Sequence, residues 1–246
     1  MMDSNSRKGY CSGIISLMKK PISEVAVITG DIEGSSRLDA NRRLDLYETF
    51  PSLSRLLREK YPRAVKYPVS NFRGDGWQLV VNTPEKSFEI ALFIRTYIRF
   101  RFQKEKLDTR TAIGIGPVQF IPEDNVSAGD GPAYLVSGRL LEGFSSSFMG
   151  IAFSEVHGDG LLMESLETLI DLLDFQVTSW GAGHAQSINL ALKGLTQYEI
   201  ASSWHPDPIK QPSVSKSLQT AGWQQIKNSL FLIEKLILEL MQGEGN

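Results

Sequence analysis

The sequence predicts an α+β fold in which a mixed, largely antiparallel sheet carries helices on one face and precedes an all-helical C-terminal third. Two observations lead to this fold class. Apolar or β-branched runs alternate with helical spacing up to residue 154, in the order β-α-β-β-α-β-α-β. Beyond residue 154 the strand signals stop and helical spacing alone continues. We therefore expect a serine-rich, disordered tail over residues 1–20, an α+β domain over 21–157 and a helical domain over 158–246.

The elements of the α+β domain follow from hydrophobic spacing and turn residues. The Gly74-Asp75-Gly76 sequence lies between two apolar runs and predicts a hairpin. Thr83 and Pro84 suit the N-cap and the first residue of a long helix. The expected elements are strand 25–29, helix 43–60, hairpin strands 64–72 and 77–81, helix 84–106, strand 111–116, helix 131–144 and strand 149–154.

The helical domain is read from apolar positions three and four residues apart. Thr196 suits an N-cap, and Gly222 suits a helix break. The expected helices are 161–175, 185–192, 195–204, 213–223 and 224–241. The last helix carries a heptad seam, Ile226, Leu230, Ile233, Ile237 and Leu240, which is expected either to pair two chains or to pack on its own domain.

Composition limits the classes of protein to consider. A net charge of −2 over 246 residues gives no global attraction to nucleic acid, so DNA binding would need a local patch. The single cysteine, Cys11, excludes an intrachain disulfide and a cysteine-based zinc site. No apolar run approaches the length of about 20 residues that spans a bilayer, so we expect no membrane partner and a cytoplasmic location. The most basic local cluster, Arg95, Arg99, Arg101, Lys104 and Lys106, is expected to be a solvated helix face.

Two Gly-Asp pairs lie at the edges of apolar, strand-like runs and carry the strongest chemical signal. Asp31 and Asp75 are placed to lie at neighbouring strand ends, where two carboxylates can share one or two divalent ions. Asp31 precedes a small-residue turn, Gly34-Ser35-Ser36, whose backbone N–H groups suit a phosphate. Magnesium prefers one or two carboxylates together with phosphate oxygens, so the pattern predicts a site for a nucleoside triphosphate and a metal.

Four segments in this order and spacing resemble the class III nucleotidyl cyclase fold. They are GDIEGSS at 30–36, GDG at 74–76, TAIGIGPV at 111–118 and GDGPAYLVSGRLLEG at 129–143. The whole chain resembles more specifically the SatD family, bacterial proteins in which a cyclase-like domain precedes a helix-turn-helix. The resemblance covers residues 24–229 and implies a ferredoxin-like, class III cyclase-like sheet.

The resemblance assigns roles to individual residues. It implies that Asp31 and Asp75 bind Mg²⁺ or Mn²⁺, and that Arg139 stabilises charge in the transition state. Two positions depart from the cyclase pattern. Asn71 falls where purine cyclases carry a base-reading Lys, and Leu135 falls where they carry the Asn that orients the ribose. The nucleotide-binding residues implied are Ile32, Glu33, Gly34, Ser35, Ser36 and Asn71.

The segment from 195 to 223 is typical of a helix-turn-helix. Val214 and Leu218 are expected to anchor its second helix inward. Hydrogen-bonding residues that suit base edges and phosphates are then left outward, namely Ser213, Ser215, Lys216, Gln219 and Thr220. Residues 205–212 make the turn about twice the usual length, and residues 184–246 hold as many acids as lysines. Contacts with protein instead of DNA therefore stay open.

Three interpretations follow. The first is a cytoplasmic regulator in which a nucleotide- and magnesium-binding cyclase-like domain is coupled to a DNA-reading helix-turn-helix. The second is an active nucleotidyl cyclase or related phosphoryl-transfer enzyme, and the third is an interaction module with two vestigial domains. The departures from the cyclase pattern at Leu135 and Asn71 favour nucleotide binding over catalytic turnover. A homodimer is expected because the resemblance implies a site between two chains and because helix-turn-helix readers pair to match two half-sites.

Overall fold

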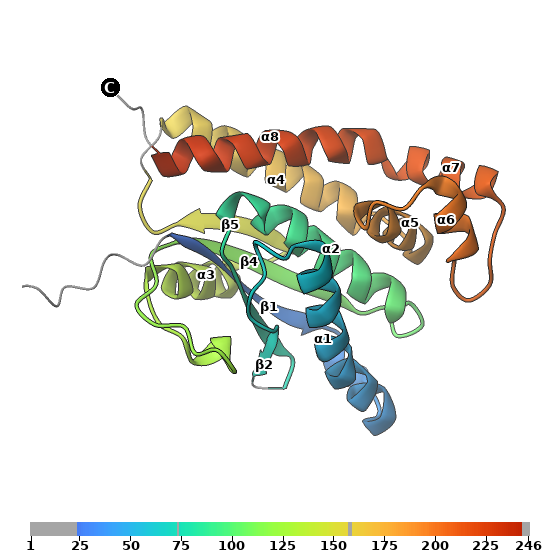
Figure 1. Ribbon diagram of the computed structural model, residues 1–246, viewed down its shortest axis with the longest axis horizontal. Coiled ribbons are helices and arrows are strands. Elements are labelled where there is room, and N and C mark those ends of the chain that lie inside the picture. Colours follow the sequence, from blue (N-terminus) through green and yellow to red (C-terminus); the bar gives the residue numbers. More distant parts are fainter. Residues whose placement is uncertain (1–23, 73, 157–158, 243–246) are drawn as a thin grey trace, which may run out of the picture.

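The computed structural model describes residues 24–72, 74–156 and 159–242, which form a five-stranded sheet with helices packed around it (Figure 1). The predicted tail over residues 1–20 lies outside the described residues. The strands are β1 (Val25–Glu33), β2 (Ser70–Phe72), β3 (Gly76–Val81), β4 (Asp108–Gly116) and β5 (Met149–Phe153). Their order is β2-β3-β1-β4-β5, and only the β4–β5 pair is parallel. The predicted α+β class and largely antiparallel sheet are confirmed.

The helices fall into two groups along the chain. Within the α+β part they are α1 (Ala40–Lys60), α2 (Ser87–Arg101) and α3 (Pro132–Gly143), with short 3₁₀ turns η2 (Ser35–Arg37), η3 (Pro84–Lys86) and η4 (Val126–Ala128). The C-terminal part contains α4 (Gly160–Thr178), α5 (Ala182–Leu192), α6 (Gln197–Ser202), α7 (Gln211–Ala221) and α8 (Trp223–Gln242).

Both faces of the sheet are covered, which corrects the expectation of helices on one face only. Side chains alternate along β1, and Ala26 and Ile28 join the main core beneath α1 and α2. Val25 and Val27 point the other way and pack with Ala133 of α3. The crossover from β4 to β5 places α3 there, because two parallel neighbouring strands need a connection that crosses a face of the sheet.

Two predicted elements are shorter than expected. The helix expected over 84–106 is a 3₁₀ turn followed by α2, and the Thr83 side chain makes no capping hydrogen bond. Helix α2 ends before Phe102, and Lys106 adopts φ 54° as the chain turns into β4. The first hairpin strand, expected over 64–72, covers only Ser70–Phe72.

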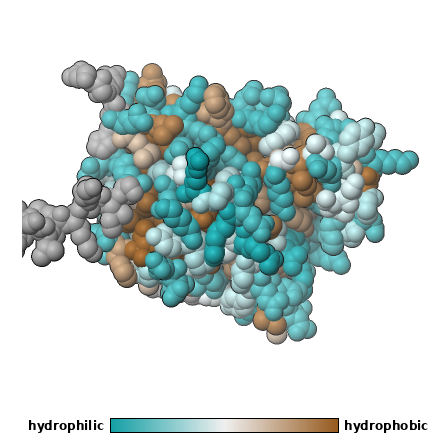
Figure 2. All heavy atoms as spheres, viewed as in Figure 1, coloured by the Kyte–Doolittle hydropathy of each residue, from teal (hydrophilic) through white to brown (hydrophobic). Residues whose placement is uncertain are grey.

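The C-terminal helices share the main core with α1 and α2. Heptad positions of α8 such as Ile226 and Ile237 are fully buried within their own chain, so the seam is used for intrachain packing. Thr196 caps α6 in a capping box with Glu199, and Gly222 ends α7 at φ 77°, as predicted. Figure 2 shows that one face of the molecule is mostly hydrophilic, with hydrophobic side chains in separate small areas. No helix in the described part of the chain is long and apolar enough to cross a bilayer.

Arg95 joins α2 to β4 and α4 through a buried ion cluster, which corrects its prediction as a solvated residue. Its side chain is fully buried and donates to Asp108 at 2.9 and 3.0 Å, to Asp174 at 2.5 Å and to the Thr178 hydroxyl at 2.8 Å. Arg99 also pairs with Asp108. Sequence periodicity could not show this, because the two acids lie on other elements.

Candidate functional site

The register of the sheet brings the two predicted carboxylates to one place. Asp31, near the end of β1, pairs with Gly76 of β3, so Asp75 is the next residue of the hairpin. The Ile32 amide donates to the Asp75 carbonyl at 3.2 Å, which fixes the hairpin tip against β1. Gly74 adopts φ 85° at this tip, the left-handed conformation that glycine accepts without strain. The hairpin predicted from the sequence therefore forms, with Asp75 beside the end of β1.

Arg110 is a neighbour of Asp31 that the sequence did not predict. Asp31 of β1 pairs directly with Arg110 of β4, on the side opposite to β3. The Arg110 Nε donates to Oδ1 of Asp31 at 2.9 Å, and a terminal nitrogen donates to Oδ2, so both carboxylate oxygens are used. This hydrogen bonding raises the pKa of Arg110, and the charges of Glu33 and Asp75 add to the same effect.

A cavity of about 320 Å³ opens between the turn after β1, the hairpin tip and α1. Ser35 and Ser36 line it from the turn, and Gly74 and Asp75 line it from the hairpin. The Ser35 hydroxyl donates to Oδ2 of Asp75 at 2.8 Å, which ties the turn to the hairpin. Gly34 begins the turn at φ 85°. The turn predicted to bind phosphate and one of the two predicted carboxylates thus share one cavity.

Helix α1 supplies cavity residues that sequence reasoning missed. Arg43 and Tyr47 line it, one helical turn apart and both exposed. A guanidinium suits a phosphate, and an aromatic ring suits a base or a sugar face. The sequence did hold a signal for them. Arg43 and Tyr47 are spaced one helical turn apart and point outward, because the apolar positions of α1 face the core.

The arrangement does not fit a resident magnesium ion. Both oxygens of Asp31 accept hydrogen bonds from Arg110, whose positive charge is permanent. One oxygen of Asp75 accepts from Ser35. The magnesium or manganese role implied for Asp31 and Asp75 therefore has no metal site to support it.

The remaining predicted residues do not line this cavity. The Asn71 amide donates to the Gly74 carbonyl at 3.4 Å and so supports the hairpin loop. Glu33 is exposed at the end of β1. Arg139 and Leu135 are exposed on α3, and neither lines the cavity. In a single chain the structure thus separates Arg139 from Ser35 and Asp75.

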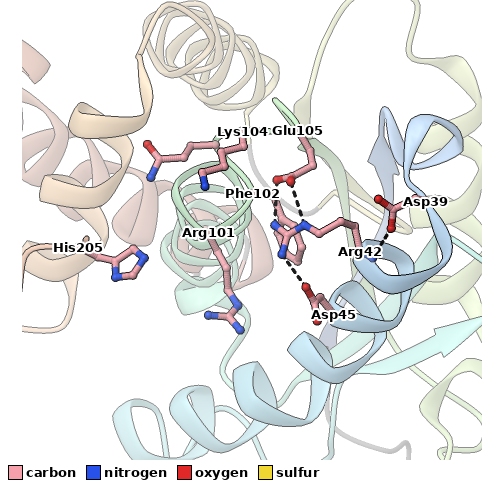
Figure 3. A pocket seen from close by; sticks show the side chains of 9 residues that line it. Asp39, Arg42, Asp45, Arg101, Phe102, Lys104, Glu105 and His205 are labelled. Atoms are coloured by element: carbon pink, nitrogen blue, oxygen red, sulfur yellow. Dashed lines mark hydrogen bonds and ion pairs between the residues drawn. The ribbon is translucent and has the colours of Figure 1, made fainter. Parts of the chain in front are cut away.

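A second cavity, of about 540 Å³, lies between the start of α1, the end of α2 and the α6–α7 connection (Figure 3). Arg42 donates to Glu105 at 2.8 and 2.9 Å and to Asp45 at 2.5 Å, as the dashed lines in Figure 3 mark. Arg101 and His205 line it from other elements. No predicted site residue lines this second cavity. The charged side chains that α1 contributes to it pair with each other and with Glu105.

The predicted DNA-binding face of α7 is outward. Val214 and Leu218 are buried against the other C-terminal helices, as expected. The outward set includes Ser213, Lys216, Gln219 and Thr220, which are exposed, and Ser215, which is half-buried. Thr220 also makes a 3.0 Å hydrogen bond with His184 of α5.

Comparisons with known proteins identify likenesses only among solved structures. No protein-family model and no curated protein matches the chain. The chain is similar to the guanylyl cyclase Cya2, at 14% identity and TM-score 0.41, over 52% of this chain and 74% of that one. It is similar to the adenylyl cyclase CyaB from P. aeruginosa, at 17% identity and TM-score 0.40, over 52% and 76%. It is also similar to an adenylate/guanylate cyclase/hydrolase from Silicibacter pomeroyi, at 21% identity and TM-score 0.38, over 50% and 70%. These likenesses are distant, so the proposals below rest on the residues of this chain.

Proposed function

We propose that the α+β part of this protein is a cyclase-like module that binds a nucleoside triphosphate as a signal and does not cyclise it. The observation that carries the proposal is the cavity in which Ser35, Ser36 and Asp75 meet Arg43 and Tyr47. Serine hydroxyls and backbone N–H groups suit phosphate oxygens. Arg43 supplies a cation for the same phosphates, and Tyr47 supplies an aromatic surface.

Low turnover follows from Leu135, whose side chain cannot hydrogen-bond a ribose. Arg139 lies on α3 and does not line the cavity of its own chain. An active enzyme would need Arg139 from a second copy, which makes a cyclase-active homodimer the alternative function. In the proposed binding function, this SatD-type chain uses its C-terminal helices to transmit the nucleotide signal.

DNA binding is the second candidate for the C-terminal helices, and the exposed α7 face favours it. Lys216 and Gln219 project from the same outward side of α7 while Val214 and Leu218 anchor the helix. Lys216→Ala is expected to weaken binding to all DNA sequences and to lower the salt slope by about one unit. Gel-shift titrations at several salt concentrations measure this, and a wild-type protein that binds no duplex would remove the candidate.

Competition with a fluorescent nucleotide tests the nucleotide proposal. Mant-ATP and mant-GTP are titrated with the wild-type chain, then displaced by each of the four NTPs. Arg43→Ala is expected to weaken binding about tenfold or more, because one charge-assisted phosphate contact is lost. Arg58→Ala, an exposed arginine on the same helix, is the matched control and is expected to bind like the wild type. Equal affinities for the two variants would place the nucleotide elsewhere.

Mass spectrometry separates binding from turnover. The chain is incubated with all four NTPs and Mn²⁺, and we expect little or no cyclic nucleotide. Light scattering on the same sample reports whether it exceeds the 27.4 kDa monomer. Robust cyclic product from a dimer, lost in Arg139→Ala, would establish the enzyme alternative in place of the proposal.

A further inference from the structure

The Arg110 guanidinium is bound to Asp31, one of the two carboxylates to which the cyclase resemblance assigns a metal ion. Arg110 and Asp31 are cross-strand neighbours on β4 and β1, so the backbone ladder itself sets their approach. The guanidinium fork is bidentate on Asp31, with Nε on one oxygen and a terminal nitrogen on the other. A divalent ion that used Asp31 as a ligand would have to displace both hydrogen bonds.

The charges around Arg110 match the charges that would hold a metal. Asp31, Glu33 and Asp75 all act on this guanidinium, with Asp31 in direct contact. An arginine is protonated at every accessible pH, so it keeps a positive charge here in all conditions. A divalent ion beside it would meet strong like-charge repulsion in a partly buried setting, since the side chains of Arg110 and Asp31 are only 32% and 24% exposed.

We propose that Arg110 is a built-in counter-ion of Asp31 that excludes a divalent cation from this carboxylate, so that the protein binds its ligand without a metal ion at Asp31. The proposal rests on the proposed function for the identity of the ligand. The exclusion of metal does not depend on the proposed function, because it is a property of Arg110, Asp31 and Asp75 alone.

The competing explanation is an ordinary surface ion pair with no effect on ligands. Partly exposed pairs of this kind contribute at most about 1 kcal/mol to stability under either explanation. Under the competing explanation the pair opens when Mn²⁺ or Mg²⁺ is present, and Asp31 binds the metal with Arg110 still in place. The two explanations therefore differ in the metal affinity of the wild-type protein, measured with no nucleotide present.

Electron paramagnetic resonance of free Mn²⁺ makes this measurement directly. The full chain is titrated with Mn²⁺ as wild type, as Arg110→Ala and as Arg110→Gln, which removes the charge but keeps hydrogen-bond donors. We expect the wild type to bind Mn²⁺ at Asp31 at least about tenfold more weakly than both variants do, because the variants lack the repelling charge. Adding Asp31→Asn to either variant is expected to abolish the gained binding.

Two further variants control for charge and for folding. Arg110→Lys keeps a positive charge beside Asp31 and is expected to exclude Mn²⁺ like the wild type. Arg63→Ala removes an exposed arginine on the connection after α1 and is expected to change nothing. Wild-type binding of Mn²⁺ that Asp31→Asn abolishes would overturn the proposal, and so would a lack of gained binding in both Arg110→Ala and Arg110→Gln. Circular dichroism confirms that each variant is folded before titration.

A nucleotide arm distinguishes failure of this inference from failure of the proposed function. Mant-nucleotide affinity is compared in EDTA and in Mg²⁺ for wild type and Arg110→Gln. The inference predicts metal-independent binding by the wild type and metal-dependent binding by the variant. A wild-type protein that binds no nucleotide in either buffer would refute the proposed function, while the Mn²⁺ result would still decide the role of Arg110.

Discussion

The chain contains two arginine–aspartate clusters on the same strand, and they differ in what surrounds them. At the start of β4, Asp108 pairs with Arg95, whose guanidinium is fully buried among Asp174, Thr178 and the Phe148 ring. Two residues along β4, Arg110 pairs with Asp31 while about a third of its side chain stays exposed. The first cluster joins three elements, and the second joins two strands.

The difference separates a structural role from a role in ligand binding. A buried arginine whose three side-chain nitrogens all donate to other side chains holds elements together, because removing either partner leaves an unpaired charge in the interior. Asp174 also accepts from the Phe148 amide at 2.8 Å, which fixes the start of β5. The partly exposed pair contributes little to folding, so its bidentate geometry has a consequence chiefly for what can approach Asp31.

Arg95→Met is the largest expected effect, because it leaves Asp108 and Asp174 buried without their main partner. The free energy of unfolding is expected to fall by about 3–5 kcal/mol, as for other broken buried pairs. Urea denaturation followed by circular dichroism measures the loss. Arg55→Met, an exposed arginine on α1, is the matched control and should stay within about 0.5 kcal/mol of the wild type. A similar small loss for Arg95→Met would contradict a structural role for the buried cluster.

A double-mutant cycle on Arg110 and Asp31 is expected to give a much smaller value. Arg110→Ala, Asp31→Ala and the double variant should yield a coupling energy of about 0.2–1 kcal/mol, since both side chains are partly solvated. The same urea experiment measures it. A coupling as large as the loss in Arg95→Met would show that the pair is structural, and it would remove the contrast between the two clusters.

The smallest effect concerns acid stability at a third pair, Arg42 with Glu105. Hydrogen bonding from Arg42 lowers the pKa of Glu105 below its ordinary value of 4.5. A carboxyl whose folded pKa is depressed stabilises the protein above its unfolded pKa, and this stabilisation is lost as pH falls through the folded pKa. Glu105→Gln should therefore destabilise slightly at pH 7 and flatten the loss of stability below about pH 4.5. Identical acid unfolding curves for wild type and variant would contradict this.

The sequence predicted the hairpin and the position of Asp75, because glycine-rich turns between apolar runs are local signals. It did not predict Arg110 as the partner of Asp31, since the two lie 79 residues apart and meet only through strand register. Arg95 was missed for a related reason: a charged residue on a helix usually faces solvent, and its acids come from other elements. The side of the sheet that α3 covers also depends on long-range topology. Local chemistry was therefore predictable here, whereas partners set by register were not.

The most direct test of the account is isothermal titration of the wild-type chain with each of the four NTPs, once in EDTA and once in Mg²⁺. The account predicts that at least one NTP binds in EDTA with a single site, and that Mg²⁺ does not tighten this binding. Arg43→Ala should weaken this binding about tenfold or more, and Arg58→Ala should bind like the wild type. Binding that occurs only in Mg²⁺, or no binding of any NTP in either buffer, would contradict a metal-independent nucleotide site built from Ser35, Asp75 and Arg43.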